Sequence, residues 1–146
     1  MLDSKLVASV QALIDSDETV SSAFVAVKGS RPGIEALTLF PFTLALLVTG
    51  SYPLAVVVGV VGFVTVVARR KFRTVALTDR NVVLLANSYR RPRRAASLLT
   101  RLPCRGAISP PDESKGDKRI AINGETYWLY PRDLDESRRM TKLTAA

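Results

Sequence analysis

An uncharged apolar run from Ala36 to Ala68 constrains the fold of this chain more than any other feature of the sequence. At about 33 residues it is longer than the roughly 20 helical residues that cross a bilayer. The tetrapeptide Gly50-Ser51-Tyr52-Pro53 near its middle is typical of a turn. The run therefore predicts a transmembrane helical hairpin, with one arm from Ile34 to Thr49 and the other from Tyr52 to Ala68.

Basic residues flank this run, while its central turn carries no charge. Loops rich in Lys and Arg remain on the cytoplasmic side of a membrane. The pattern predicts a multi-pass protein of the inner (plasma) membrane with both termini cytoplasmic. Two alternatives remain: a single oversized, kinked span with its ends on opposite sides, and a re-entrant hairpin in one leaflet. The basic residues expected to set the topology are Arg69, Arg70, Lys71 and Arg73.

Charge is distributed unevenly along the 146 residues, whose net charge is +8. Residues 1–35 hold three basic and five acidic side chains, whereas residues 69–146 hold eighteen basic and eight acidic ones. The apolar arms carry no charge beyond Glu35, which argues against a transporter or a pump. With no histidine and one cysteine, the chain lacks the usual ligands for a zinc site, and we expect no metal and no cofactor.

Outside the apolar run, the sequence alternates strand and helix signals. Leu2–Ile14 has the apolar spacing of a helix, and Val20–Lys28 is a β-branched strand pattern. Asn123-Gly124 is a strong hairpin-turn signal between two further strands. The other predicted elements are strands at Phe72–Thr78, Val82–Asn87, Lys118–Asn123 and Thr126–Tyr130, a basic loop at Tyr89–Arg94, and a closing helix at Arg132–Leu143.

The segment Phe72–Leu85 (FRTVALTDRNVVLL) resembles the core hairpin of bacterial PH-like and GRAM-like domains, which are often attached to membrane helices. Arg101-Leu102-Pro103 and Gly124–Leu129 are similar to small membrane proteins of actinobacteria and their phages. The resemblance covers Lys71–Leu143. It implies an α+β fold, in which a transmembrane helical hairpin accompanies a small PH-like β-roll or barrel closed by a C-terminal helix. It also implies that Val20–Lys28 is the first strand of that roll.

Three regions follow from this interpretation. Residues 1–33 would form an N-terminal helix and the first strand, residues 34–68 the transmembrane hairpin, and residues 69–146 a basic cytoplasmic PH-like domain.

The densest charge cluster indicates a binding site for anions. Arginine recognises phosphate through its planar fork, and each base near a membrane surface adds up to about 1 kcal/mol of attraction to anionic lipid. A solvated loop is the simpler alternative, and no nucleic acid is expected as a partner. The candidate residues are Arg90, Arg91, Arg93 and Arg94.

No catalytic arrangement is evident, because the chain has no histidine base and no nucleotide-binding or hydrolase motif. Asp133, Asp135 and Glu136 lie among arginines, as expected of an ion-paired surface, and Trp128 is expected in the core. The sequence thus predicts a non-enzymatic membrane protein whose basic domain binds anionic lipid headgroups or a membrane partner protein. The alternative is an interaction protein whose hairpin forms homo-oligomers or blocks another membrane complex, as in phage exclusion.

Overall fold

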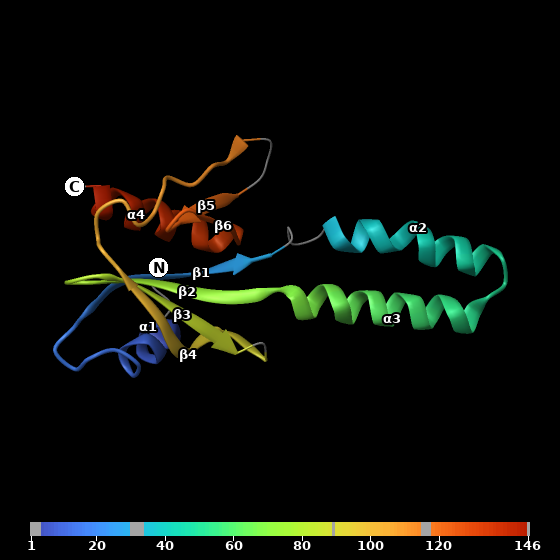
Figure 1. Cartoon of the computed structure of the whole chain (residues 1–146), viewed down its shortest axis with the longest axis horizontal. Coiled ribbons are helices and arrows are strands. Elements are labelled where there is room, and N and C mark those ends of the chain that lie inside the picture. Colours follow the sequence, from blue (N-terminus) through green and yellow to red (C-terminus); the bar gives the residue numbers. More distant parts are fainter. Residues whose placement is uncertain (1–3, 30–33, 89, 115–117, 146) are drawn as a thin grey trace. The chain divides into compact units, whose positions relative to one another are not determined.

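A computed structural model of the chain describes residues 4–29, 34–88, 90–114 and 118–145, and divides into two compact units (Figure 1). One unit combines Met1–Lys28 with Lys71–Ala146, and the other is Gly29–Arg70. The first unit contains α1 (Ser4–Gln11), β1 (Val20–Lys28), β2 (Lys71–Thr78), β3 (Val82–Ser88), β4 (Arg91–Leu102), β5 (Arg119–Ile122), β6 (Glu125–Leu129), the 3₁₀ helix η2 (Pro131–Asp133) and α4 (Leu134–Ala145). The second contains α2 (Ile34–Val48) and α3 (Tyr52–Arg69).

All six strands of the first unit belong to one antiparallel sheet in the order β4-β3-β2-β1-β6-β5. β1 is therefore a central strand, although it is separated from β2 in the sequence by the two helices of the second unit. Lys28 and Lys71 stand opposite each other in the β1–β2 register. The helical unit is thus an insertion at one end of this strand pair.

The central strands are apolar on both faces because both faces of the sheet are covered. Phe24, Ala26 and Val75 belong to a core that includes Leu134 and Met140 of α4. The alternate residues Ala23, Val25 and Ala76 belong to a second core with Leu6 and Val10 of α1. Alternation of strand side chains thus divides one sheet between two cores.

Local sequence signals account for the ends of the elements. Asn123 (φ 50°) and Gly124 (φ 78°) both adopt positive φ, as the two-residue turn between β5 and β6 requires. Tyr127, and not Trp128, is the fully buried aromatic residue of β6, with 1% of its surface exposed. Trp128 is only half-buried, with the Arg119 guanidinium 5.6 Å from its ring centre.

The prediction of a transmembrane hairpin is wrong. Among the described residues, no helix is both long enough and apolar enough to cross a membrane. α2 has 15 residues, fewer than the roughly 17–25 of a spanning helix, and α3 has 18. The predicted fold class, a transmembrane hairpin beside a PH-like roll, is replaced by an α+β fold with a six-stranded antiparallel sheet.

The expected multi-pass location in the inner membrane, with both termini cytoplasmic, is wrong for the same reason. The topology-setting role expected of the basic residues after the apolar run presupposes a helix that spans a membrane. Arg69 instead ends α3, Arg70 connects α3 to β2, and Lys71 and Arg73 belong to β2.

Because Lys28 and Lys71 are partners in the β1–β2 ladder, a two-residue turn is long enough to join them. Replacing residues 29–70 by Asn-Gly should give a chain that folds with one cooperative thermal transition, followed by circular dichroism. Residues 71–146 alone should not show that transition, because they lack the central strand β1. Equal folding of both chains would contradict the observed strand order.

Candidate functional site

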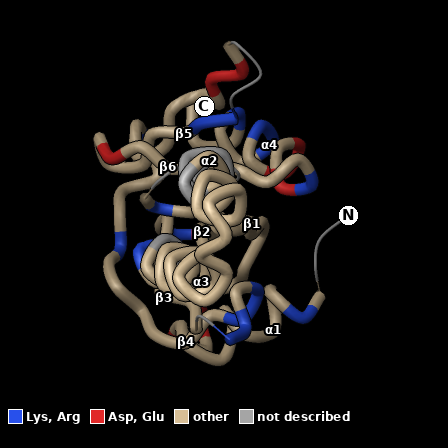
Figure 2. Tube along the Cα trace, turned by 90° about the vertical axis from the view of Figure 1, so that its right-hand side faces the viewer, with Lys and Arg blue, Asp and Glu red and all other residues tan. Residues whose placement is uncertain are grey.

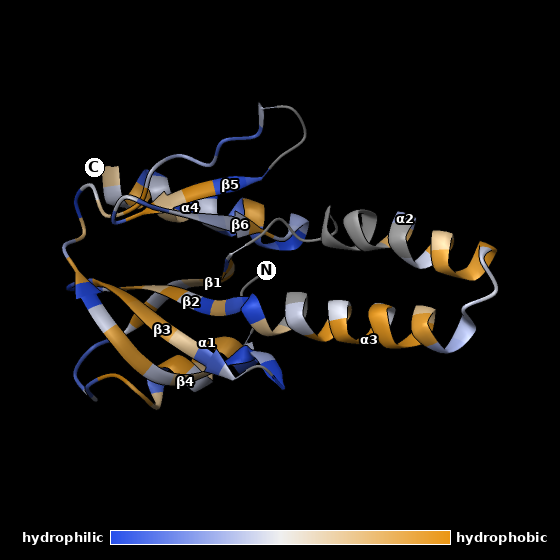
Figure 3. Cartoon of the chain, turned by 45° about the vertical axis from the view of Figure 1, so that its right-hand side comes forward, coloured by the Kyte–Doolittle hydropathy of each residue, from blue (hydrophilic) through white to orange (hydrophobic). Residues whose placement is uncertain are grey.

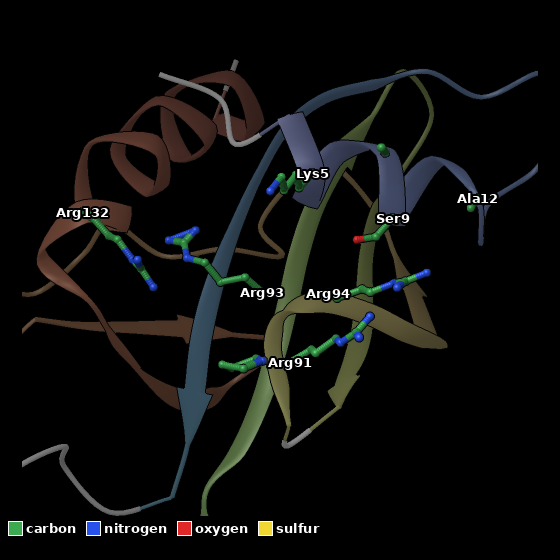
Figure 4. Close-up of a pocket in the computed structure, with 9 residues that line it drawn as sticks. Lys5, Ser9, Ala12, Arg91, Arg93, Arg94 and Arg132 are labelled. Atoms are coloured by element: carbon green, nitrogen blue, oxygen red, sulfur yellow. The ribbon is translucent and has the colours of Figure 1, made fainter.

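A pocket of about 740 Å³ in the first unit is lined by five basic side chains (Figure 4). It draws on three elements that are distant in the sequence: α1, β4 and η2. Its lining residues are Lys5, Ala8, Ser9, Ala12, Arg91, Pro92, Arg93, Arg94 and Arg132.

One side of the pocket is a stripe along α1. Lys5, Ala8 and Ser9 are three or four residues apart and so lie on the same face of a helix, while Leu6 and Val10 are buried on the opposite face. The Ser9 hydroxyl donates to the Leu6 carbonyl at 2.8 Å and accepts from the Ala95 amide at 3.1 Å. The first bond lies within α1, and the second attaches α1 to β4.

The other side is the first part of β4, which bends away from a regular ladder. The β3–β4 pairing shifts register at Leu84/Leu85 and again between Ala86 and Ser88. Such irregularities bend a strand and increase its twist. The Asn87 side chain fixes the bend, because it donates to the Pro92 carbonyl and accepts from the Thr74 hydroxyl at 2.9 Å.

The bend brings Arg93 of β4 to Asp133 of η2. The Nη2 atom of Arg93 lies 2.8 Å from Oδ1 and 2.9 Å from Oδ2 of Asp133. The side chain of Arg93 keeps 23% of its surface exposed, and that of Asp133 keeps 6%. In the sheet order, β3 and β2 separate β4 from β1, yet this ion pair connects the start of β4 with the segment that follows β6.

Asp133 is a buried residue, which corrects the expectation of an ion-paired surface. Its Oδ1 accepts the Val25 amide of β1 at 3.5 Å, and Arg132 Nε lies 3.7 Å from its Oδ2. Burial raises the pKa of the Asp133 carboxyl, while the charge of Arg93 works against that rise. One buried carboxylate therefore faces two arginines.

Arg91 and Arg94 have a different environment. Both are exposed, and neither forms an ion pair with any residue that the structure describes. The lining has five basic groups and, among the described residues, no acidic one. The basic groups belong to Lys5, Arg91, Arg93, Arg94 and Arg132. Asp133 is the counter-charge behind two of them. Arg91 and Arg94 therefore bring positive charge to the pocket that no described carboxylate pairs with.

Three of the four predicted anion-binding residues, Arg91, Arg93 and Arg94, meet at this pocket. Arg90 lies exposed in the turn before β4 and is not part of the lining. Sequence reasoning missed Lys5 and Arg132, because their proximity depends on how α1 and η2 pack. In the sequence, the one indication for Lys5 is its helical spacing from the small residues Ala8 and Ser9.

The lining is equipped for binding and offers little for catalysis. Ser9 is its one hydroxyl, and both of its hydrogen-bonding directions are used within the protein. Among the described residues, no group of three or more metal-ligating side chains comes together. Comparison with protein-family models, with curated proteins and with solved structures finds no match for this chain.

Proposed function

We propose that this protein is a non-enzymatic binding protein that takes a phosphate-bearing ligand in the pocket between α1 and β4. The observation that carries the proposal is the convergence of five basic side chains on a cavity of about 740 Å³ whose described lining has no acidic residue. Guanidinium groups match phosphate oxygens with paired, charge-assisted hydrogen bonds.

The two arginines without a described ion-pair partner are the best candidates for direct contact. Arg91 and Arg94 are exposed and need not abandon a protein carboxylate to bind an anion. Arg93 is held by Asp133 and contributes from a fixed position. A bound phosphate would supply the negative charge that the pocket lacks. This chemistry is shared by free phosphorylated metabolites and by phosphorylated lipid headgroups.

Isothermal titration calorimetry with inorganic pyrophosphate tests the proposal. The wild-type protein should bind it, and Arg91→Gln combined with Arg94→Gln should weaken binding at least tenfold. A hydrogen bond to a charged group contributes about 1.5–3 kcal/mol, and about 1.4 kcal/mol corresponds to a tenfold change in affinity. Losing two such bonds should therefore weaken binding by at least this factor.

The matched control is Arg90→Gln combined with Arg139→Gln, which removes the same charge from two exposed arginines outside the pocket. The control should bind within about twofold of the wild type. No binding by the wild type, or equal weakening by both double variants, would contradict a specific phosphate pocket. A second arm with phosphatidylglycerol vesicles distinguishes a lipid headgroup from a free phosphate.

A second candidate function concerns the helical unit. α2 and α3 pack on each other and bury Ala55, but twelve large apolar side chains from Phe40 to Val64 stay 39–81% exposed. Much of α3 has the orange of hydrophobic residues in Figure 3. No charged residue occurs between Phe40 and Ala68, and the tube over this part is tan in Figure 2. Monomeric proteins rarely expose apolar patches of this size.

We propose that a second copy of this chain covers that surface. Three of the twelve are aromatic residues, each with an area of roughly 150–250 Å², and the other nine are smaller valines and leucines, so at these exposures the set offers on the order of 1,000 Å². A standard interface buries about 800 Å² on each partner. Since the surface is uncharged, two copies can meet there without like-charge repulsion, despite the net charge of +8.

Light scattering coupled to gel filtration measures this association directly. The wild type should be a dimer at micromolar concentration, and Val57→Asp combined with Val61→Asp should be a monomer, because each exposed valine would bring a charge into the interface. Leu143→Asp changes an exposed apolar residue of α4 and serves as the control. A monomeric wild type would refute self-association through the helical unit.

A further inference from the structure

We infer that the ligand is an amphiphile: a phosphate monoester whose apolar chain lies along the groove between α1 and β4. This inference rests on the proposed phosphate pocket and adds the chemical class of the rest of the ligand.

The first observation is that the pocket continues beyond the arginines. A second cavity of about 350 Å³ shares Ser9, Ala12, Arg91 and Arg94 with the first. Its remaining lining consists of Leu13, Ser88, Ala95 and Ala96. The two cavities therefore form one groove, which follows α1 from Lys5 and continues past its end to Leu13.

The second observation is that basic side chains become fewer along this groove: five line the first cavity and two line the second. Lys5, Arg93 and Arg132 line only the first cavity, whereas Leu13, Ala95 and Ala96 line only the second. Figure 4 shows Lys5, Arg93 and Arg132 together on one side of the pocket and Ala12 on the other. The two cavities overlap at Arg91 and Arg94. Such a groove matches a molecule with one anionic end and one apolar end.

The third observation is the size of the side chains between the two ends. Ala8 and Ser9 of α1, and Ala12 just after it, line the groove with small side chains, and Ala96 of β4 adds another. α1 rises about 9 Å from Lys5 to Gln11, so an extended chain of several methylenes can lie beside it. A purely polar phosphate ester would gain nothing from Ala12, Leu13 and Ala96.

Alkyl phosphates of different length test the inference by calorimetry. A fully buried methylene contributes about 0.8 kcal/mol, a factor of about four, and an open groove should retain about half of this, a factor of about two. Octyl phosphate should therefore bind the wild type on the order of 50-fold more tightly than ethyl phosphate. Ala12→Leu fills the shared part of the groove and should reduce this ratio at least fivefold.

Ala145→Leu adds the same bulk at an exposed site of α4 and is the matched control. Ala96→Leu, exposed on β4, repeats the test from the other wall if Ala12→Leu does not fold. Equal binding of both esters by the wild type would refute the apolar subsite and leave the phosphate pocket standing. If the octyl-to-ethyl affinity ratio stays the same in both groove variants, the alkyl chain of the ligand binds elsewhere and the inference is refuted. If neither ester binds, the phosphate pocket itself is refuted.

Discussion

The ion pair between Arg93 and Asp133 holds the start of β4 against η2, and the arrangement of the first unit depends on this contact. β4 is the last strand on one side of the sheet, and η2 follows β6 on the other side of β1. A flat sheet would keep these segments apart, because each strand adds nearly 5 Å to its width. The contact is possible only because the irregular β3–β4 pairing turns the start of β4 back over the sheet.

Asp133 also resolves a local problem of β1. β6 pairs with β1 only at Ala26 and Val27, which leaves the first part of this edge without a strand partner. The Asp133 carboxylate accepts the Val25 amide, and Glu136 of α4 accepts the Ser22 hydroxyl at 2.6 Å. Asp133 thus accepts a backbone amide of β1 where β6 departs, while Glu136 holds the side chain of Ser22. Since unpaired buried amides are costly, this edge needs such acceptors.

The same arrangement explains why a positively charged pocket exists. Burying a charge is unfavourable unless it is paired, and Arg93 and Arg132 share a single carboxylate. The turn of β4 that delivers Arg93 also carries Arg91 and Arg94, which have no such counter-charge in the described chain. Excess positive charge therefore collects where the sheet curls, beside the small-residue face of α1.

The sequence allowed several elements to be predicted from short-range physics. Val20–Lys28 is a strand with the predicted bounds, and Asn123-Gly124 is the turn of a hairpin. Two errors came from context that local patterns do not carry. Arg91–Arg94 looks like a loop but begins β4, and Asp133 looks like a surface acid but is buried. The apolar run was assigned to a membrane from its composition, yet no helix in the described part of the chain is both long and apolar enough to cross one.

A double-mutant cycle on Arg93 and Asp133 tests the central claim most directly. The free energy of unfolding would be measured by urea denaturation for Arg93→Met, Asp133→Ala and the double variant. Breaking a buried ion pair from one side costs about 3–5 kcal/mol, so Asp133→Ala should lose about 3 kcal/mol and the double variant clearly less than the sum of the single losses. A coupling energy near zero would contradict the view that this pair holds the curled sheet together.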